Sequence, residues 1–431
     1  MKIIDLRNQN IPPSGGWATL LPRPEADTLS LEATVANILK EVREHGDEAV
    51  RRFTLAFDKM TLETWAVNEK EIADAGSSVS RELRLAIQQA KKNIELFHGT
   101  QLQPLKKIET MPGVLCWRKS VAIEKVGLYI PGGTAPLFST LLMLAIPAVL
   151  AGCREIVLCS PPDSNGKLHP ALLYCAQLTG IKKIFKVGGA QAIAAMAYGT
   201  NTIPRVYKIF GPGNRYVTSA KQLVQKDGLA IDIPAGPSEL AIYADHSANP
   251  GFLAADLLSQ AEHGVDSQVI LVCKEEATIH RVLSEIEIQL KKLPRREMAA
   301  ASLQNSRAVL VRDQTQAMEV LNDYAPEHLI LACEKPEKVS AGVVNAGSVF
   351  LGHYAPESVG DYASGTNHTL PTNGYARSYS GVSLDSFIRK ITFQQLTKEG
   401  LGQIGPTVVS MAEAEGLQAH ANAVLIRLSG E

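Results

Sequence analysis

The chain has 431 residues, of which 45% are hydrophobic and 20% are charged, and this balance is typical of a folded protein rather than a disordered one. Its 43 basic and 44 acidic residues give a formal net charge of −1, and no basic stripe stands out, which argues against a nucleic-acid partner. A chain of this length can bury a large core divided over two or more domains.

The opening hundred residues are predicted to be rich in helices. Residues 1–25 carry prolines at positions 12, 13, 22 and 24, so this segment is expected to be irregular. Between residues 31 and 45 the apolar positions follow helical spacing, and Gly46 is a typical helix stop. Another helix is predicted over residues 80–98, where the apolar side chains fall on one face.

One charge-free stretch, residues 130–153, is long enough to span a bilayer. It is interrupted by Pro131, Gly132, Gly133, Pro136, Pro147 and Gly152. A glycine-rich turn followed by a buried helix fits these interruptions better than a membrane span does. We therefore expect no association with a membrane.

Beyond residue 125, short apolar runs alternate with predicted helices. Nine runs have the length and composition of strands: residues 126–130, 155–159, 184–187, 208–210, 240–243, 268–273, 308–311, 329–333 and 348–351. This alternation predicts parallel sheets with crossover helices, and nine strands predict two α/β units rather than one sheet. Residues 234–237 are expected to cross between the units, and residues 383–431 to form a small helical tail.

The cysteines and the N-terminus predict a cytoplasmic protein. No Cys-x-x-Cys pair is present, and most of the six cysteines have apolar neighbours, as buried free thiols do. They are Cys116, Cys153, Cys159, Cys175, Cys273 and Cys333. Asp5 places an acid too early for a signal peptide.

Four of the ten histidines lie in short segments that also carry acids or amides, and the first such segment is a candidate metal site. Asn249 and Pro250 begin a predicted helix that Gly264 ends, and Gln260 and His263 share one face at its C-terminal end. Gln is a weak, neutral ligand, however, and the His-Glu-x-x-His pattern is absent. The helix dipole alone favours a histidine there, and this second interpretation is the better one for the segment by itself.

The second segment places an acid beside a base. Glu327 and His328 directly precede an apolar run, where they could activate water and transfer a proton. A solvated loop dipeptide is the alternative.

The remaining two segments lie nearer the C-terminus. Residues 352–368 form a long polar loop with Asp361 and His368, and a loop this rich in functional groups is typical of a binding loop. Glu415 and His420 lie in the tail, where they would by themselves be a surface pair.

Three glycine-rich turns follow predicted strands, at residues 131–133, 188–191 and 211–214. Such turns allow the backbone to approach a phosphate group at a helix N-terminus. None completes Gly-x-Gly-x-x-Gly and no P-loop is present, so tight strand-to-helix turns are the alternative.

Taken together, these segments make the chain resemble the histidinol dehydrogenase family over nearly its whole length. The motifs that carry the resemblance are residues 127–133, 208–214, 234–239, 258–264, 326–329 and 360–368. The resemblance implies two Rossmann-like parallel-sheet units with small N-terminal and helical C-terminal modules. It also implies the oxidation of histidinol to histidine in two steps, in a homodimer that uses NAD and one zinc ion per subunit.

The resemblance further implies roles for particular residues. The zinc ligands would be Gln260, His263, Asp361 and His420. The catalytic pair would be Glu327 and His328, and NAD would contact Tyr129, Gln191 and Asn214. Substrate would contact Ser238, Gln260, His263, Glu327, Asp361, His368, Glu415 and His420, and the last two would come from the partner subunit.

The implied division of the chain has four parts. Residues 1–25 would form the N-terminal segment, and residues 26–128 with 238–381 a first unit that carries most zinc ligands. Residues 129–237 would form an NAD-binding unit, and residues 382–431 a helical module that reaches the partner's site.

Two other classes of function remain open. In a zinc hydrolase, Glu327 would activate water and no nucleotide would bind. In a noncatalytic metal-binding scaffold, repeats or low-complexity tails would be expected, and the sequence has neither.

Overall fold

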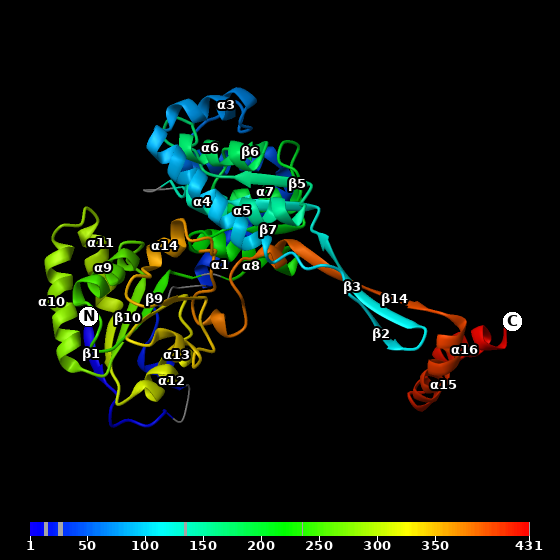
Figure 1. The fold of residues 1–431 in the computed structure, drawn as a ribbon. Coiled ribbons are helices and arrows are strands. Elements are labelled where there is room, and N and C mark those ends of the chain that lie inside the picture. Colours follow the sequence, from blue (N-terminus) through cyan, green and yellow to red (C-terminus); the bar gives the residue numbers. More distant parts are fainter. Residues whose placement is uncertain (13–15, 25–28, 133–135, 235, 431) are drawn as a thin grey trace.

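The computed structural model describes residues 1–12, 16–24, 29–132, 136–234 and 236–430. Figure 1 shows two α/β units side by side and an extended arm that carries the C-terminal helices away from both. One unit is built on a five-stranded parallel sheet and the other on a six-stranded parallel sheet, while three antiparallel strands form the arm. The predicted α/β class with two parallel-sheet units is therefore confirmed.

The five-stranded sheet has the order β6-β5-β4-β7-β8. Its strands are β4 (Lys125–Tyr129), β5 (Glu155–Cys159), β6 (Lys183–Phe185), β7 (Lys208–Phe210) and β8 (Ala230–Ile231). Its crossover helices are α5 (Phe138–Ala151), α6 (Pro170–Thr179), α7 (Gly189–Tyr198) and α8 (Arg215–Lys226). Helix α5 is buried along most of its length, as predicted for the charge-free stretch. Within the described ranges, no helix is long and apolar enough to cross a membrane.

The N-terminal helices cover both faces of this five-stranded sheet. They are α1 (Leu29–His45), α2 (Asp47–Asp58), α3 (Glu69–Ser78) and α4 (Arg81–Gly99). Helix α1 packs on α7 and α8, whereas α3 packs on α6 and α4 on α5. The resemblance grouped residues 26–128 with 238–381, but in the structure residues 29–99 pack against the five-stranded unit instead.

The six-stranded sheet has the order β1-β11-β10-β9-β12-β13 and is parallel throughout. Its strands are β1 (Lys2–Asp5), β9 (Glu239–Ala244), β10 (Gln268–Cys273), β11 (Arg307–Leu310), β12 (His328–Ala332) and β13 (Ser348–Leu351). Its helices are α9 (Pro250–Ala261), α10 (Glu276–Leu290), α11 (Arg296–Asn305), α12 (Gln314–Tyr324), α13 (Pro336–Ser340) and α14 (Glu357–Tyr362). The expectation that the N-terminal segment is wholly irregular is wrong, because β1 adds an edge strand beside β11.

The arm consists of β2 (Lys107–Met111), β3 (Val114–Ala122) and β14 (Ile388–Leu396), and it leads to the helix pair α15 (Lys398–Ala414) and α16 (Gln418–Ser429). Short 3-10 helices occupy Trp17–Leu20, Tyr375–Arg377 and Leu384–Phe387. The tail is therefore not purely helical, since β14 pairs with β3 over nine residues. This strand is exposed along nearly its whole length, so it lacks the alternating burial that marks a strand in the sequence.

Two expected turns fall partly on undescribed residues. Gly133 of the turn after β4, and Ala235 of the crossing between the two units, lie outside the described residues.

Candidate active site

The candidate catalytic residues gather at the amino ends of β9 and β12. His328 is the first residue of β12 and is in register with Leu240 of β9, so Glu327 lies beside Glu239. Helix α9 runs back from the end of β9, which returns Gln260, in its last turn, to the same edge. The site thus lies at the amino edge of this sheet, whereas ligands of open α/β sheets usually bind at the carboxyl edge.

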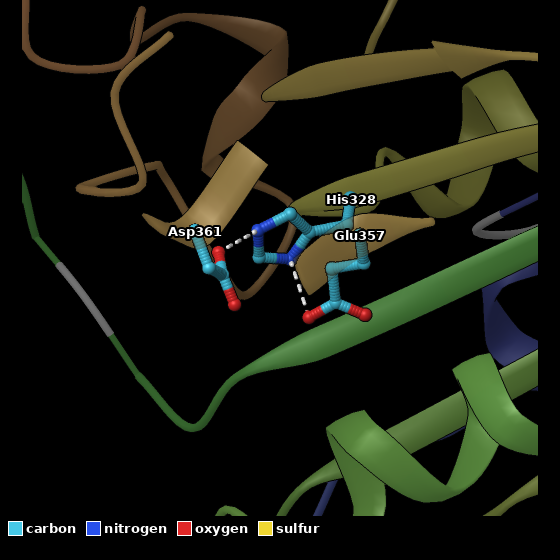
Figure 2. A group of neighbouring side chains, drawn as sticks. All are labelled: His328, Glu357 and Asp361. Carbon is cyan, nitrogen blue, oxygen red and sulfur yellow. Dashed lines mark ion pairs between the residues drawn. The ribbon is translucent and has the colours of Figure 1, made fainter. Parts of the chain in front are cut away.

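His328 is surrounded by acids. Its Nδ1 lies 3.1 Å from the carbonyl oxygen of Glu239, and because a carbonyl only accepts, Nδ1 carries the proton. As Figure 2 shows, the ring also faces Glu357, 3.7 Å from Nδ1, and Asp361, 3.6 Å from Nε2. Burial would lower the pKa of His328, but Glu357, Glu327 and Asp361 outweigh burial and raise the pKa to about 10.

Buried contacts around Glu239 hold the Glu327 carboxyl in place. Its Oε2 accepts a hydrogen bond of 2.8 Å from the backbone N–H of Glu239 and lies 3.6 Å from Nδ1 of His328. Burial raises the pKa of the Glu327 carboxyl to about 8. The side chain of Glu239 is paired with Arg23, which also donates to the carbonyl oxygen of Tyr324 at 2.7 Å.

Gln260 and His263 lie at and just beyond the C-terminal end of α9. Gln260 is fully buried, and neither its Oε1 nor its Nε2 has a hydrogen-bond partner among the described residues. His263 lies at the exposed mouth of the site. Loss of water around its ring lowers the pKa of His263, and the charge of nearby Asp361 offsets only part of that shift. An unbonded buried amide costs free energy, and a bound ion or substrate would supply the missing partner.

The donor atoms that lie close together offer a second ligand set. One atom each of His328, Glu357 and Asp361 lies within 4.8 Å of the others, so these three could also hold an ion. Only Asp361 belongs to both this cluster and the set implied by the resemblance. The pKa values of Glu327 and Glu357 are both raised to about 8, chiefly by burial, and a cation bound beside them would favour their charged forms.

His368 joins the two α/β units instead of facing an open space. Its Nδ1 lies 2.7 Å from the carbonyl oxygen of Asp361, and its Nε2 lies 3.0 Å from the hydroxyl of Thr140 on α5. The neighbouring Asn367 donates to the carbonyl oxygen of Met143 at 2.6 Å. Both ring nitrogens of His368 are therefore already bonded to the protein. Ser238, another expected substrate contact, lies directly before β9 and is partly buried.

Glu415 and His420 are not brought to this site within one chain. Glu415 follows α15 and His420 lies in α16, and both are exposed at the far end of the arm (Figure 1). The structure thus brings Gln260, His263, Asp361, Glu327 and His328 together and leaves these two apart.

A cavity of about 910 Å³ opens at the carboxyl ends of β4, β5, β6 and β7. All three residues expected to contact NAD, namely Tyr129, Gln191 and Asn214, line it. Helices α6, α7 and α8 begin at its wall, so their N-terminal partial positive charges face the cavity. This volume suits a large organic ligand.

Local contacts fix the three expected NAD residues. The hydroxyl of Tyr129 accepts from the backbone N–H of Gly189 at 3.0 Å, and Gln191 is buried with its Oε1 unbonded among the described residues. Asn214 uses Oδ1 to cap α8 through two bonds of 3.1 Å. Gly211 precedes this cap at a φ of 125°, and a Cβ there would collide with the carbonyl oxygen of Tyr129.

A buried ion pair supports the same turn. Lys221 pairs with Asp232, and both side chains are almost fully buried. Lys221 donates to the carbonyl oxygen of Gly211 at 2.8 Å, and Asp232 accepts from the N–H of Gly211 at 2.7 Å.

Sequence reasoning missed Glu357, Glu239 and Arg23. Glu357 stands among the polar residues of the long loop, and nothing in its spacing separates it from them. Arg23 and Glu239 are 216 positions apart, so their pairing has no local signal. For Glu239, an acid at the start of an apolar strand was the one available sign.

The comparisons with known proteins agree with this geometry. The histidinol dehydrogenase family model matches residues 21–428. The chain is 62% identical over 413 residues to a histidinol dehydrogenase of Bacteroides thetaiotaomicron, with 96% of each chain covered. It is 60% identical over 417 residues to one of Bacteroides fragilis, with 97% of each covered. The crystal structure of histidinol dehydrogenase from Elizabethkingia anophelis matches with a TM-score of 0.96 at 52% identity, covering 100% of this chain and 98% of that one. The chain therefore belongs to the histidinol dehydrogenase family.

Proposed function

We propose that this protein oxidises histidinol to histidine in two NAD-dependent steps, through histidinaldehyde, as the last reactions of histidine biosynthesis. The observation that carries the proposal is the Glu327–His328 pair beside the unbonded buried amide of Gln260. The 910 Å³ cavity in the neighbouring unit provides room for the dinucleotide. NAD, when bound, accepts one hydride in each oxidation.

Zinc would be held by Gln260, His263 and Asp361, with His420 of the partner subunit as the fourth ligand. Zinc, when bound, has no redox role and orients the imidazole and amine of the substrate. The unbonded amide of Gln260 and the nearby carboxylate of Asp361 fit such a site.

His328 is suited to take the proton that each oxidation releases. Its Nδ1–H is directed at the carbonyl oxygen of Glu239, and its Nε2 has no hydrogen-bond partner in the described part of the chain. A cation bound at the neighbouring Asp361 would lower the raised pKa of His328, and Nε2 of the neutral ring would then accept the proton from the substrate hydroxyl.

Glu327 is suited to the step in which water adds to the aldehyde. Its Oε2 is held by the N–H of Glu239, and burial raises its pKa to about 8, so above that pH its carboxylate is a stronger base than that of an ordinary glutamate. Enclosing the aldehyde between these residues keeps a reactive intermediate from escaping. No cysteine nucleophile takes part in this route.

The active site is proposed to be shared in a homodimer, with Glu415 and His420 supplied by the partner subunit. In support, the arm and its helices expose large apolar side chains, among them Phe393, Met411, Leu425 and Ile426. Exposed apolar surface of this kind marks interaction sites. We also propose that the protein works in the cytoplasm, in keeping with its six free cysteines.

The test is NAD reduction with histidinol, followed at 340 nm, a property of the cofactor, before and after chelation. Two NADH per histidinol are expected, and none once the metal is removed. A hydrolase that uses Glu327-activated water, the other candidate, would yield no NADH with histidinol.

A further inference from the structure

Asp58 lines the 910 Å³ cavity but has no role in the fold that we can identify. It is the last residue of α2 and is partly buried. The C-terminal end of a helix carries partial negative charge, so an acid there is unfavourable. Burial raises the pKa of Asp58 further, because the charged form loses water.

No cation in the described part of the chain pairs with this carboxylate. Within the described ranges Asp58 forms no salt bridge, and its one hydrogen bond is a long one of 3.5 Å from Nε2 of Gln191. The other acid of the cavity differs, because Oδ1 of Asp163 accepts two backbone hydrogen bonds of 2.8 and 2.9 Å. An acid at a helix C-terminus with no compensating partner is unfavourable for the fold, and such a residue is expected to interact with a ligand.

The ligand group that Asp58 meets follows from its place in the cavity. The polar loop of residues 352–368 contacts α5, which follows β4, through His368 and Thr140. Asp58 instead lies on the opposite face of the five-stranded sheet, where α2 packs on α7 and Gln191 contacts the carboxylate. A dinucleotide with its nicotinamide at the polar loop would therefore bring its adenosine half toward Asp58.

We propose that Asp58 makes this enzyme select NAD over NADP. Its carboxylate accepts hydrogen bonds from the ribose hydroxyls of the adenosine half and repels a phosphate group at the 2′ position. Gln191, which is buried, lies against the carboxylate of Asp58. The inference rests on the proposed function, because it assumes that the cavity binds a dinucleotide.

The test is to measure NAD and NADP binding to the full-length protein by calorimetry, for wild type and for Asp58→Asn. The wild type should prefer NAD, and the variant should lose about tenfold of that preference, the effect of one strong hydrogen bond. Glu48→Gln is the matched control, because it removes the same charge from the exposed first turn of the same helix. Asp58→Asn should also melt no lower than wild type, since an uncompensated charge is removed.

The outcomes separate this inference from the function on which it rests. NAD binding with unchanged preference in Asp58→Asn would overturn the role of Asp58 alone. Absence of dinucleotide binding to the wild-type protein would overturn the proposed function and this inference together. A lower melting temperature of Asp58→Asn, with both nucleotides weakened equally, would show a structural role and also overturn it.

Discussion

The backbone N–H of Glu239 donates a hydrogen bond of 2.8 Å to the carboxylate of Glu327, while the Glu239 side chain pairs with Arg23. Two acids thus lie side by side in a buried position, and Arg23 from the N-terminal segment pairs with one of them, Glu239. The same Glu239 carboxylate also accepts from the backbone N–H of Asn373 at 3.0 Å. The start of β9 is therefore held by this ion pair and these hydrogen bonds as well as by strand pairing within the sheet.

Arg23→Met should destabilise the protein strongly. Removing one partner of a buried ion pair leaves the other charge uncompensated, which costs about 3–5 kcal/mol of unfolding free energy. The pKa of Glu239, already raised by burial, would rise further. An acid with a raised pKa in the folded state loses stability as pH rises, so the deficit should be larger at pH 8 than at pH 5.

Urea denaturation at the two pH values measures this effect. Arg7→Met is the control, because Arg7 pairs with Asp5 at an exposed position and its loss should change little. Equal destabilisation by the two substitutions would contradict the importance of the buried pair.

The two candidate ligand sets can be separated by zinc binding. Asp361→Asn should weaken zinc binding roughly 10–100-fold whichever ligand set holds the ion, because the substitution removes an anionic ligand. Gln260→Met should abolish tight binding only if Gln260 is a ligand, and Glu357→Gln only if the His328–Glu357–Asp361 cluster holds the ion. Zinc retained per chain after dialysis, with restoration of activity by added zinc, is the measurement.

Gln260→Met has a second expected result in metal-free protein. It replaces a buried amide without partners by an apolar side chain of similar size, so it should raise the unfolding free energy by about 1–3 kcal/mol. A loss of stability would mean that the amide has a partner we have not identified.

The regular parts of the fold could be predicted because burial leaves a local pattern. All nine expected strands are present, since each is a short apolar run within a parallel sheet. The missed strand β14 is exposed and gains its stability from pairing with β3, more than 250 positions earlier. No window of sequence contains that information.

The candidate site could be predicted only in part. Glu327 and His328 are adjacent in sequence, and Gln260 and His263 share a helix end, so spacing alone suggested both pairs. Their convergence depends on α9 returning to the amino edge of the sheet, which is a property of topology. The carboxylate of Glu357 and the bonded state of His368 depend on side-chain geometry that no motif records.

Cysteine variants should keep both oxidations. Burial raises the pKa of the Cys153 thiol to about 12, and no cysteine lines the cavity or joins the His328 cluster in the described part of the chain. Cys153→Ala and Cys116→Ala should therefore still convert added histidinaldehyde to histidine. A folded variant that accumulated the aldehyde would show that a thioester is needed.

His328 and Glu327 should differ in which step they affect. His328→Ala should slow both hydride transfers, by roughly 10²–10⁴-fold, because each oxidation releases a proton to a base. Glu327→Gln should slow mainly the oxidation of histidinaldehyde, where water must be activated. Single-turnover rates with histidinol and with the aldehyde measure the two steps separately, and equal loss in both steps for Glu327→Gln would remove its special role.

Mixing two inactive variants tests whether the active site is shared between subunits. His420 lies at the end of the arm, away from Gln260 and Asp361 of its own chain (Figure 1). His328→Ala and His420→Ala homodimers should each be nearly inactive.

If the tail completes the partner's site, each heterodimer has one site with both lesions and one site with none. After unfolding, mixing in equal amounts and refolding, half of the dimers are mixed, so activity should recover to about a quarter of wild type. Without sharing, every site keeps one lesion and mixing restores nothing. An affinity tag on one variant isolates the heterodimers, and tagged heterodimers that form but stay inactive would contradict the shared site.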